Sequence, residues 1–174
     1  IARDFPETSF AWGTTTNVGE AEGVTNVFAY DPRLEQGGYV SGVLAANITE
    51  SNVIGLVGPV DAGDAKLHVD GFVAGVHAID PDIQVNVSFT GSFGDTALAA
   101  EAASTHIAAG ADVLTGSAQQ VVGAVGIAEN AGVPWMGVQA DQTSLAPDTV
   151  VATVFYDWGP TLLNIITSNQ AGEY

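Results

Sequence analysis

Four loops of the sequence contain side chains that could bind a ligand, and each loop directly follows a short apolar run. Together they offer a phenylalanine, amides, hydroxyls and carboxylates, a set suited to stacking on a flat ligand and hydrogen bonding to its edge. They contain neither GxxxxGK[ST] nor GxGxxG after a strand, so no phosphate-binding loop is predicted. The loops are PVDAGD at 59–64, TGSFGD at 90–95, SAQQ at 117–120 and QADQTS at 139–144.

Phe93 is the most unusual of these side chains. The other residues of its turn are glycine, serine and aspartate, which turns use for backbone reasons. A large aromatic there is exposed unless something covers it, and two interpretations are open: Phe93 packs on the core, or it stacks on a ligand. Asp95, in the same turn, has a simpler expected role, because its carboxylate can cap a helix beginning at Thr96.

Amide side chains are the expected hydrogen-bonding groups. Gln139 directly follows a predicted strand, so its amide is well placed to reach a ligand beyond the strand's end. Gln119 and Gln120 start a predicted helix, and we expect one of them to face the ligand while the other is solvated. Asp141 and Trp12 complete the candidate set, although Asp141 could only shape its turn and Trp12 could belong to the core.

Catalysis is the alternative from another functional class, and it has little support in the sequence. The histidines lie within predicted helices, which favours structural roles, and no GxSxG motif supplies a nucleophile. A hydrolase of this kind would use loop carboxylates as a base or as metal ligands. We therefore expect no catalytic residue, no metal site and no cofactor. The histidines are His68, His77 and His106, and the carboxylates are Asp61, Asp64 and Asp141.

The elements that position the loops alternate between short strands and longer helices. Strands are predicted at 8–14, 52–58, 83–89, 111–116, 134–138 and 149–155. Helices are predicted at 34–48, 65–79, 96–110, 118–132 and 159–172. Strands that alternate with helices of this length indicate an α/β fold, a Rossmann-like parallel sheet flanked by helices. In such sheets ligands bind beyond the carboxyl ends of the strands, which is where the four loops begin.

Composition excludes several classes of partner. The chain of 174 residues has 20 acidic and 3 basic side chains and a net charge of −17, which argues against nucleic acid and anionic membrane surfaces. The hydrophobic fraction of 47% is too high for a disordered chain, and there is no cysteine. No apolar run reaches the roughly 18–20 residues that span a bilayer. The chain begins without Met and without the regions of a signal peptide, so we expect a processed or truncated product.

Several segments resemble the basic membrane lipoprotein family, the substrate-binding proteins of ABC transporters that include purine nucleoside receptors. These segments are YVSGVLAANITESNVIGLVG at 39–58, GFVAGVHAIDPDIQVNVSFTGSFGD at 71–95, IAAGADVL at 107–114 and GVQADQTSLAPDTVVATVFYDW at 137–158. The opening ARDFPETSFAWG at 2–13 is similar to a segment in the middle of the family's proteins. The resemblance covers nearly the whole chain.

The resemblance implies a type I periplasmic-binding-protein fold, with two Rossmann-like lobes and a ligand between them. The chain resembles the C-terminal lobe, at 31–151, together with fragments of the N-terminal lobe. Residues 1–30 would be a remnant of that lobe and the hinge, and residues 152–174 a return hinge and helix that pack toward it. The resemblance places the family's signal peptide, lipid-anchored cysteine and N-terminal ligand motif ahead of the segment that this sequence matches.

The resemblance also implies roles for individual residues. Phe93 matches the aromatic that stacks on the purine base. Gln139 lies where nucleoside-binding members have an aspartate that grips the ribose hydroxyls, and residues 117–120 replace their glycine-rich loop. Since an amide offers both a donor and an acceptor, Gln139 suits a free nucleobase or another flat polar heterocycle.

The implied function is an extracytoplasmic solute-binding protein of an ABC importer that binds a purine-like nucleoside or nucleobase without catalysis. Its partners would be this small molecule and the transporter permease, and its contact with the membrane would be a lipid anchor on the N-terminus of the full-length protein. The implied location is the periplasm or the outer face of the cell membrane. A receptor domain that senses the ligand for a signalling partner is an alternative.

Overall fold

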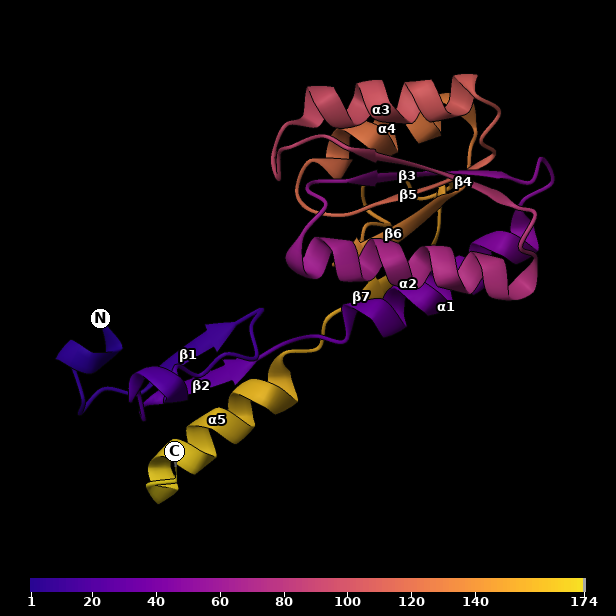
Figure 1. Cartoon of the computed structure of the whole chain (residues 1–174). Helices are drawn as coiled ribbons and strands as arrows, with labels where there is room; N and C mark the ends of the chain where they lie inside the picture. Colours follow the sequence, from indigo (N-terminus) through magenta and orange to yellow (C-terminus); the bar gives the residue numbers. More distant parts are fainter. Residues whose placement is uncertain (174) are drawn as a thin grey trace. The chain divides into compact units, whose positions relative to one another are not determined.

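The chain divides into two compact units in a computed structural model that describes residues 1–173 (Figure 1). The larger unit comprises residues 33–155. The smaller unit combines residues 1–32 with the chain from residue 156 onward. The four candidate loops all belong to the larger unit.

A parallel sheet forms the centre of the larger unit. Within residues 33–155 it has five strands in the order β4-β3-β5-β6-β7. Because all neighbouring pairs are parallel, the strands end along one edge of the sheet, called here the carboxyl edge. The strands are β3 (Val53–Gly58), β4 (Gln84–Phe89), β5 (Val113–Gly116), β6 (Trp135–Gln139) and β7 (Val150–Phe155).

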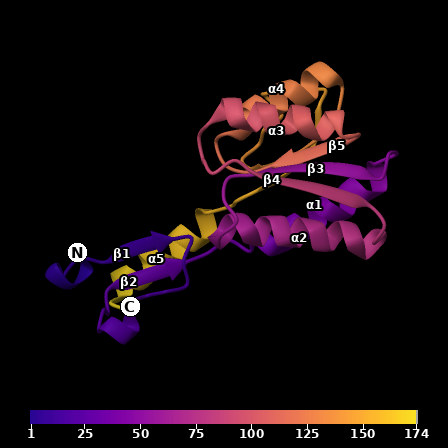
Figure 2. The same ribbon diagram turned by 45° about the horizontal axis from the view of Figure 1, so that its top comes forward.

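Helices cover both faces of this sheet. Helices α1 and α2 lie on one face, and α3 and α4 lie on the other (Figures 1 and 2). Glycines allow α1 and α2 to pack closely, since a Cβ added to Gly42 would lie 2.1 Å from the carbonyl oxygen of Phe72. The bounds are α1 (Leu34–Ile48), α2 (Gly63–Ile79), α3 (Thr96–Ala108) and α4 (Val121–Ala131).

The core consists of two apolar clusters. One cluster includes Leu114 and the fully buried Trp135 together with residues of α3 and α4. The other includes Ile54 and Phe72 together with residues of α1 and α2. Burial on both faces is typical of a parallel sheet and leaves the carboxyl edge as the place where loop side chains reach solvent.

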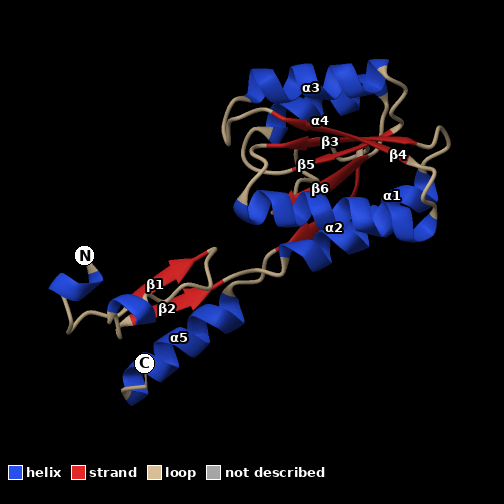
Figure 3. Cartoon of the chain, in the orientation of Figure 1, coloured by secondary structure: helices blue, strands red, loops and turns tan. Residues whose placement is uncertain are grey.

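The smaller unit contains a parallel strand pair, β1 (Phe10–Gly13) and β2 (Val27–Tyr30), and the helix α5 (Gly159–Ala171) (Figure 3). Two short 3₁₀ helices lie at Ala2–Asp4 and Glu20–Glu22. The side-chain amide of Asn26 donates hydrogen bonds to the carbonyl oxygens of Ala2, Phe5 and Thr8, which ties the N-terminal segment to the start of β2.

The predicted α/β fold is confirmed, and the predicted strands and helices lie close to the observed ones. Strand β2 was not predicted from the sequence; its four residues are all only partly buried. No helix in residues 1–173 is long and apolar enough to cross a membrane.

Candidate ligand-binding site

All four loops are joined by hydrogen bonds at the carboxyl edge. The backbone N–H of Gly91 donates to the carbonyl oxygen of Pro59, 2.8 Å away, which joins the loop after β4 to the loop after β3. The backbone N–H of Gln120 donates to the carbonyl oxygen of Phe93, 2.9 Å away, which joins the loop after β4 to the loop after β5. The backbone N–H of Ala118 donates to Oε1 of Gln139, 3.0 Å away, which joins the loop after β5 to the end of β6. The topology thus brings Phe93, Gln119, Gln120 and Gln139 into one connected group of loops.

The loop that carries Phe93 is internally bonded, although the ring itself is not buried. Oγ of Ser92 accepts hydrogen bonds from the backbone N–H groups of Gly94 and Asp95 at 3.2 and 3.1 Å. Gly91 has a φ of 77°, a left-handed conformation that glycine adopts without strain. Phe93 keeps 54% of its surface exposed, so it does not pack on the core of residues 33–155. It forms an apolar surface on a fixed loop.

Asp95 caps α3, as expected. Its Oδ1 accepts hydrogen bonds from the backbone N–H groups of Ala97 and Leu98 at 3.0 and 3.1 Å. The cap anchors the second end of the Phe93 loop to a helix.

Gln120 lies inside the protein rather than at its surface. Its side chain is completely buried, and Oε1 accepts a hydrogen bond of 2.6 Å from Oγ1 of Thr90. Its Nε2 donates to the carbonyl oxygen of Ser117. The exposed residue of the pair is Gln119. Gln120 therefore holds the loops together, and Gln119 is the glutamine whose side chain is open to solvent.

Gln139 is exposed at the end of β6 and has an unusual backbone. Its φ is 75°, and the φ of its hydrogen-bonding partner Ala118 is 70°. A non-glycine residue rarely adopts this conformation, and such residues cluster at binding and catalytic sites. Ala118 and Gln139 both have this conformation and are joined by a hydrogen bond, which favours a binding role for this part of the carboxyl edge.

Asp141 accepts a hydrogen bond within its own turn. Asp141 is exposed, and hydrogen bonds from the side chain and backbone N–H of Thr143 hold the pKa of its carboxyl below the ordinary value. Trp12 belongs to the smaller unit, where it lies on β1 and is 57% exposed.

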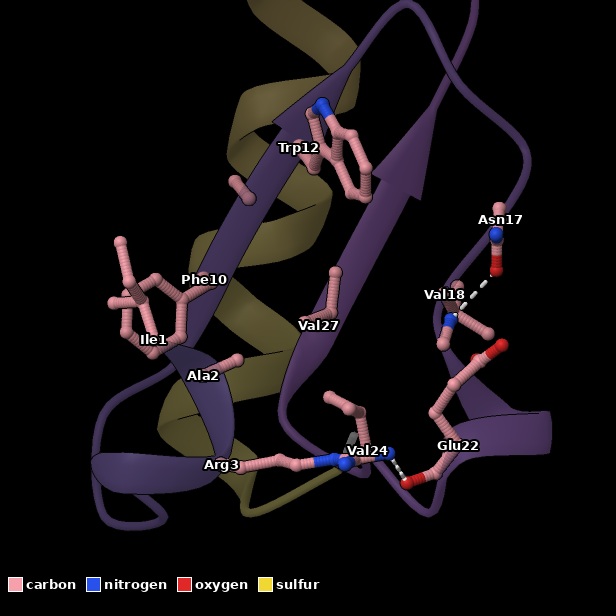
Figure 4. A pocket seen from close by; sticks show the side chains of 12 residues that line it. Ile1, Ala2, Arg3, Phe10, Trp12, Asn17, Val18, Glu22, Val24 and Val27 are labelled. Atoms are coloured by element: carbon pink, nitrogen blue, oxygen red, sulfur yellow. Dashed lines mark hydrogen bonds between the residues drawn. The ribbon is translucent and has the colours of Figure 1, made fainter.

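Trp12 lines an open, mostly apolar cavity of about 770 Å³ on the smaller unit (Figure 4). Phe10 and Val27 contribute from the two strands, and the guanidinium of Arg3 donates a hydrogen bond to the carbonyl oxygen of Glu22 at its border. The cavity has few polar groups that could orient a ligand, in contrast to the carboxyl edge of the larger unit.

The carboxylates and histidines do not converge on a reactive centre. No group of three or more His, Asp or Glu side chains within residues 1–173 could hold a metal ion. Asp61 pairs with Lys66 at 3.3 Å, and both carboxylate and ammonium are exposed. His68 and His106 are buried, and burial lowers the pKa of each, so both rings are neutral near pH 7.

Two contributors to the site were not predicted from the sequence. Thr90, at the start of the Phe93 loop, supplies the hydroxyl that bonds to Gln120, and Ala118 supplies the N–H that binds Gln139. Thr90 ends an apolar run, but its partner lies 30 residues later in the sequence, and Ala118 acts only through its backbone. Neither contact leaves a pattern in the sequence.

Comparison with known proteins gives a consistent result. The family described as "ABC transporter substrate-binding protein PnrA-like" matches residues 1–173. A purine-binding protein of Brucella abortus is 29% identical over 160 residues, which are 92% of this chain and 44% of that protein. The ABC transporter nucleoside-binding protein BmpA of Lactococcus lactis is 34% identical over 88 residues, which are 51% of this chain and 24% of that protein.

Solved structures agree on the fold. The solute-binding protein of an ABC transporter system from Aeropyrum pernix K1 superposes with a TM-score of 0.85 at 21% identity. The match covers 100% of this chain and 51% of that one. The chain thus spans about half of that structure, and 44% of the length of the Brucella relative.

Proposed function

Because the chain belongs to the PnrA-like family of ABC transporter substrate-binding proteins, we propose that the full-length protein binds a purine-like nucleoside or nucleobase at the carboxyl edge of residues 33–155. The exposed ring of Phe93 carries this proposal, because it is fixed by hydrogen bonds at a place where α/β sheets bind ligands. A rigid exposed aromatic is suited to stacking on a flat heterocycle.

The groups around Phe93 are suited to recognition rather than reaction. Gln119 and Gln139 are exposed amides that can hydrogen bond to the edge of a stacked ring, and Gln120 and Thr90 hold the loops that present them. Asp141 lies two residues beyond Gln139 and is available at the border of the site. The names of the Brucella and Lactococcus relatives, purine-binding and nucleoside-binding, support the same class of ligand.

The proposal extends to the whole protein. In this proposal residues 31–151, together with the rest of β7, correspond to the C-terminal lobe. Residues 1–30, with Trp12, are the remnant of the other lobe and the hinge, and the chain after β7 is the return hinge and a helix that packs toward that lobe. The protein acts outside the cytoplasmic membrane, is held there by a lipid anchor on the full-length chain, and delivers its ligand to an ABC transporter permease without chemical change.

Calorimetric titration of the full-length protein tests this function. The ligands are adenine, hypoxanthine, adenosine, inosine and urate, each added to the protein after removal of co-purified ligand by reversible unfolding. Saturable binding of at least one purine is expected. If none of the five binds, the purine assignment is wrong, while membership of the family of substrate-binding proteins stands.

A further inference from the structure

The orientation of the Gln139 amide is determined by its contact with Ala118. The backbone N–H of Ala118 can only donate, so the atom of Gln139 that lies 3.0 Å from it must be the oxygen Oε1. The interchange of oxygen and nitrogen that usually leaves a glutamine side chain ambiguous is therefore resolved here. The NH₂ group of Nε2 then forms the other arm of the amide, on a side chain that is exposed at the carboxyl edge.

The backbone conformations of Gln139 and Ala118 stabilise the hydrogen bond between them. Gln139 and Ala118 both have left-handed φ values, 75° and 70°, which place the end of β6 against the loop after β5. Residues in this conformation persist only when surrounding contacts stabilise them, and the Ala118–Gln139 hydrogen bond is one such contact. A side chain bonded in this way is pre-organised before a ligand arrives.

Charge further restricts the ligand. The cationic side chains of residues 33–155 are Arg33 and Lys66. Arg33 lies 3.8 Å from Glu35, and Lys66 pairs with Asp61 and Asp70 at 3.3 and 2.9 Å. Asp61 belongs to the loop after β3, so Lys66 lies close to the bonded loops, but it already has two carboxylate partners. Asp141 adds a negative charge near Gln139. Because both cations of residues 33–155 already have carboxylate partners, neither is unpaired for an anionic ligand.

We propose that Gln139 acts as a hydrogen-bond donor to the ligand and selects a neutral heterocycle that presents an acceptor, either a carbonyl oxygen or an unprotonated ring nitrogen. The inference rests on the proposed function and adds the direction of one hydrogen bond: the protein donates it and the ligand accepts it. The sequence alone predicted that the amide would offer a donor and an acceptor together, whereas the Ala118 contact uses one of the two lone pairs of the oxygen and turns the NH₂ group to the other side. A 6-oxopurine base fits this requirement, and an anionic purine such as urate does not.

The test replaces the hydrogen-bond donor of the Gln139 side chain with an acceptor. In Gln139→Glu the retained carboxylate oxygen still accepts from Ala118, but the donor is replaced by a second acceptor. We expect this variant to bind hypoxanthine at least tenfold more weakly than the wild type. Its affinity for inosine, whose ribose hydroxyls can donate, falls less, so the ratio of the two affinities shifts toward the nucleoside. Gln84→Glu, which adds the same charge at the start of β4 away from the carboxyl edge, is the matched control.

The outcomes separate the two proposals. If the wild type binds hypoxanthine and Gln139→Glu binds it equally well, the donor role is wrong and the proposed function stands. If the wild type binds none of the purines, the proposed function is wrong and this inference with it. Hydrogen exchange gives a readout without ligand: the Ala118 amide should be protected in the wild type and in Gln139→Glu, and less so in Gln139→Leu. Equal exchange in all three would overturn the assigned orientation.

Discussion

Oγ1 of Thr90 and Oε1 of Gln120 lie 2.6 Å apart, although the two residues are separated by 30 positions in the sequence. The same hydroxyl accepts a hydrogen bond from the backbone N–H of Ser92 at 3.2 Å, within the Phe93 loop. Gln120 completes the connection, because its backbone N–H donates to the carbonyl oxygen of Phe93. The Thr90–Gln120 pair therefore fixes the position of the loop that carries the exposed aromatic ring.

Removing the Thr90 hydroxyl should loosen this loop. Thr90→Val has nearly the same shape but leaves the buried Oε1 of Gln120 without its donor, which costs about 1–3 kcal/mol in the free energy of unfolding. Thr90→Ser retains the hydroxyl and should cost less. Urea denaturation measures the stability, and hydrogen exchange of residues 90–95 measures the order of the loop. Equal stability and equal exchange in the valine and serine variants would show that the hydrogen bond has no positioning role.

Phe93→Ala should separate binding from stability. Since the ring is 54% exposed, its loss should change the free energy of unfolding by only about 0.5 kcal/mol. Loss of stacking should weaken purine binding by about 1–3 kcal/mol, or roughly 5- to 150-fold. Calorimetry and thermal unfolding on the same preparation check both values. Phe93→Tyr keeps a stacking face and serves as the control. A large loss of stability with unchanged affinity would mean that the ring packs on the protein instead.

The sequence was sufficient to predict the fold and the loops that meet at the carboxyl edge, because both follow from local patterns. Alternating apolar runs predict β3 to β7, and the position of Phe93 after β4 follows from those elements. The different roles of Gln119 and Gln120 could not be predicted. The two residues are identical and adjacent, and only the hydrogen bond from the distant Thr90 hydroxyl distinguishes Gln120. The orientation of the Gln139 amide could not be predicted either, because its partner is a backbone N–H, which every residue except proline has.

Acid should destabilise the larger unit through His68. This side chain is 2% exposed, neither ring nitrogen has a hydrogen-bond partner among the described residues, and burial lowers its pKa to about 4. The unfolded chain takes up a proton below about pH 6.5, whereas the folded one does so only near pH 4. Stability is therefore fully present above pH 6.5 and falls as the pH decreases toward 4, by up to about 3 kcal/mol.

His68→Phe should flatten this pH dependence. Urea denaturation at several values between pH 7 and pH 4 gives the slope of stability against pH for each variant. His106 is also buried, and burial lowers its pKa although a hydrogen bond with the backbone of Leu56 acts in the opposite direction. Part of the dependence of stability on pH should therefore remain in His68→Phe. His77→Phe, at an exposed position of α2, is the control for replacing an imidazole with a phenyl ring. A wild-type slope in His68→Phe would assign the acid sensitivity to other groups.

Asp112 should stabilise the opposite edge of the same sheet, with a different pH dependence. Its carboxylate accepts hydrogen bonds from the Thr49 hydroxyl at 2.6 Å and from the backbone N–H groups of Glu50 and Ser51 at 2.7 Å each. Burial by itself raises the pKa of this carboxyl, but these hydrogen bonds outweigh it and hold the pKa below the ordinary value. The contacts fix the turn between α1 and β3 to the start of β5.

Asp112→Asn should lower the free energy of unfolding by about 1–3 kcal/mol at pH 7, because an amide nitrogen replaces one acceptor and the charge is lost. A carboxyl whose folded pKa is depressed contributes stability above its unfolded pKa and loses that contribution as the pH falls through the folded value. The difference between wild type and variant should therefore be constant from pH 7 to about pH 5 and narrow below about pH 4. Denaturation of both proteins across this range, with the exposed Asp82→Asn as a control for net charge, measures the difference. A difference that persists unchanged at pH 3 would show that shape at this position, and not the charged acceptor, stabilises the turn.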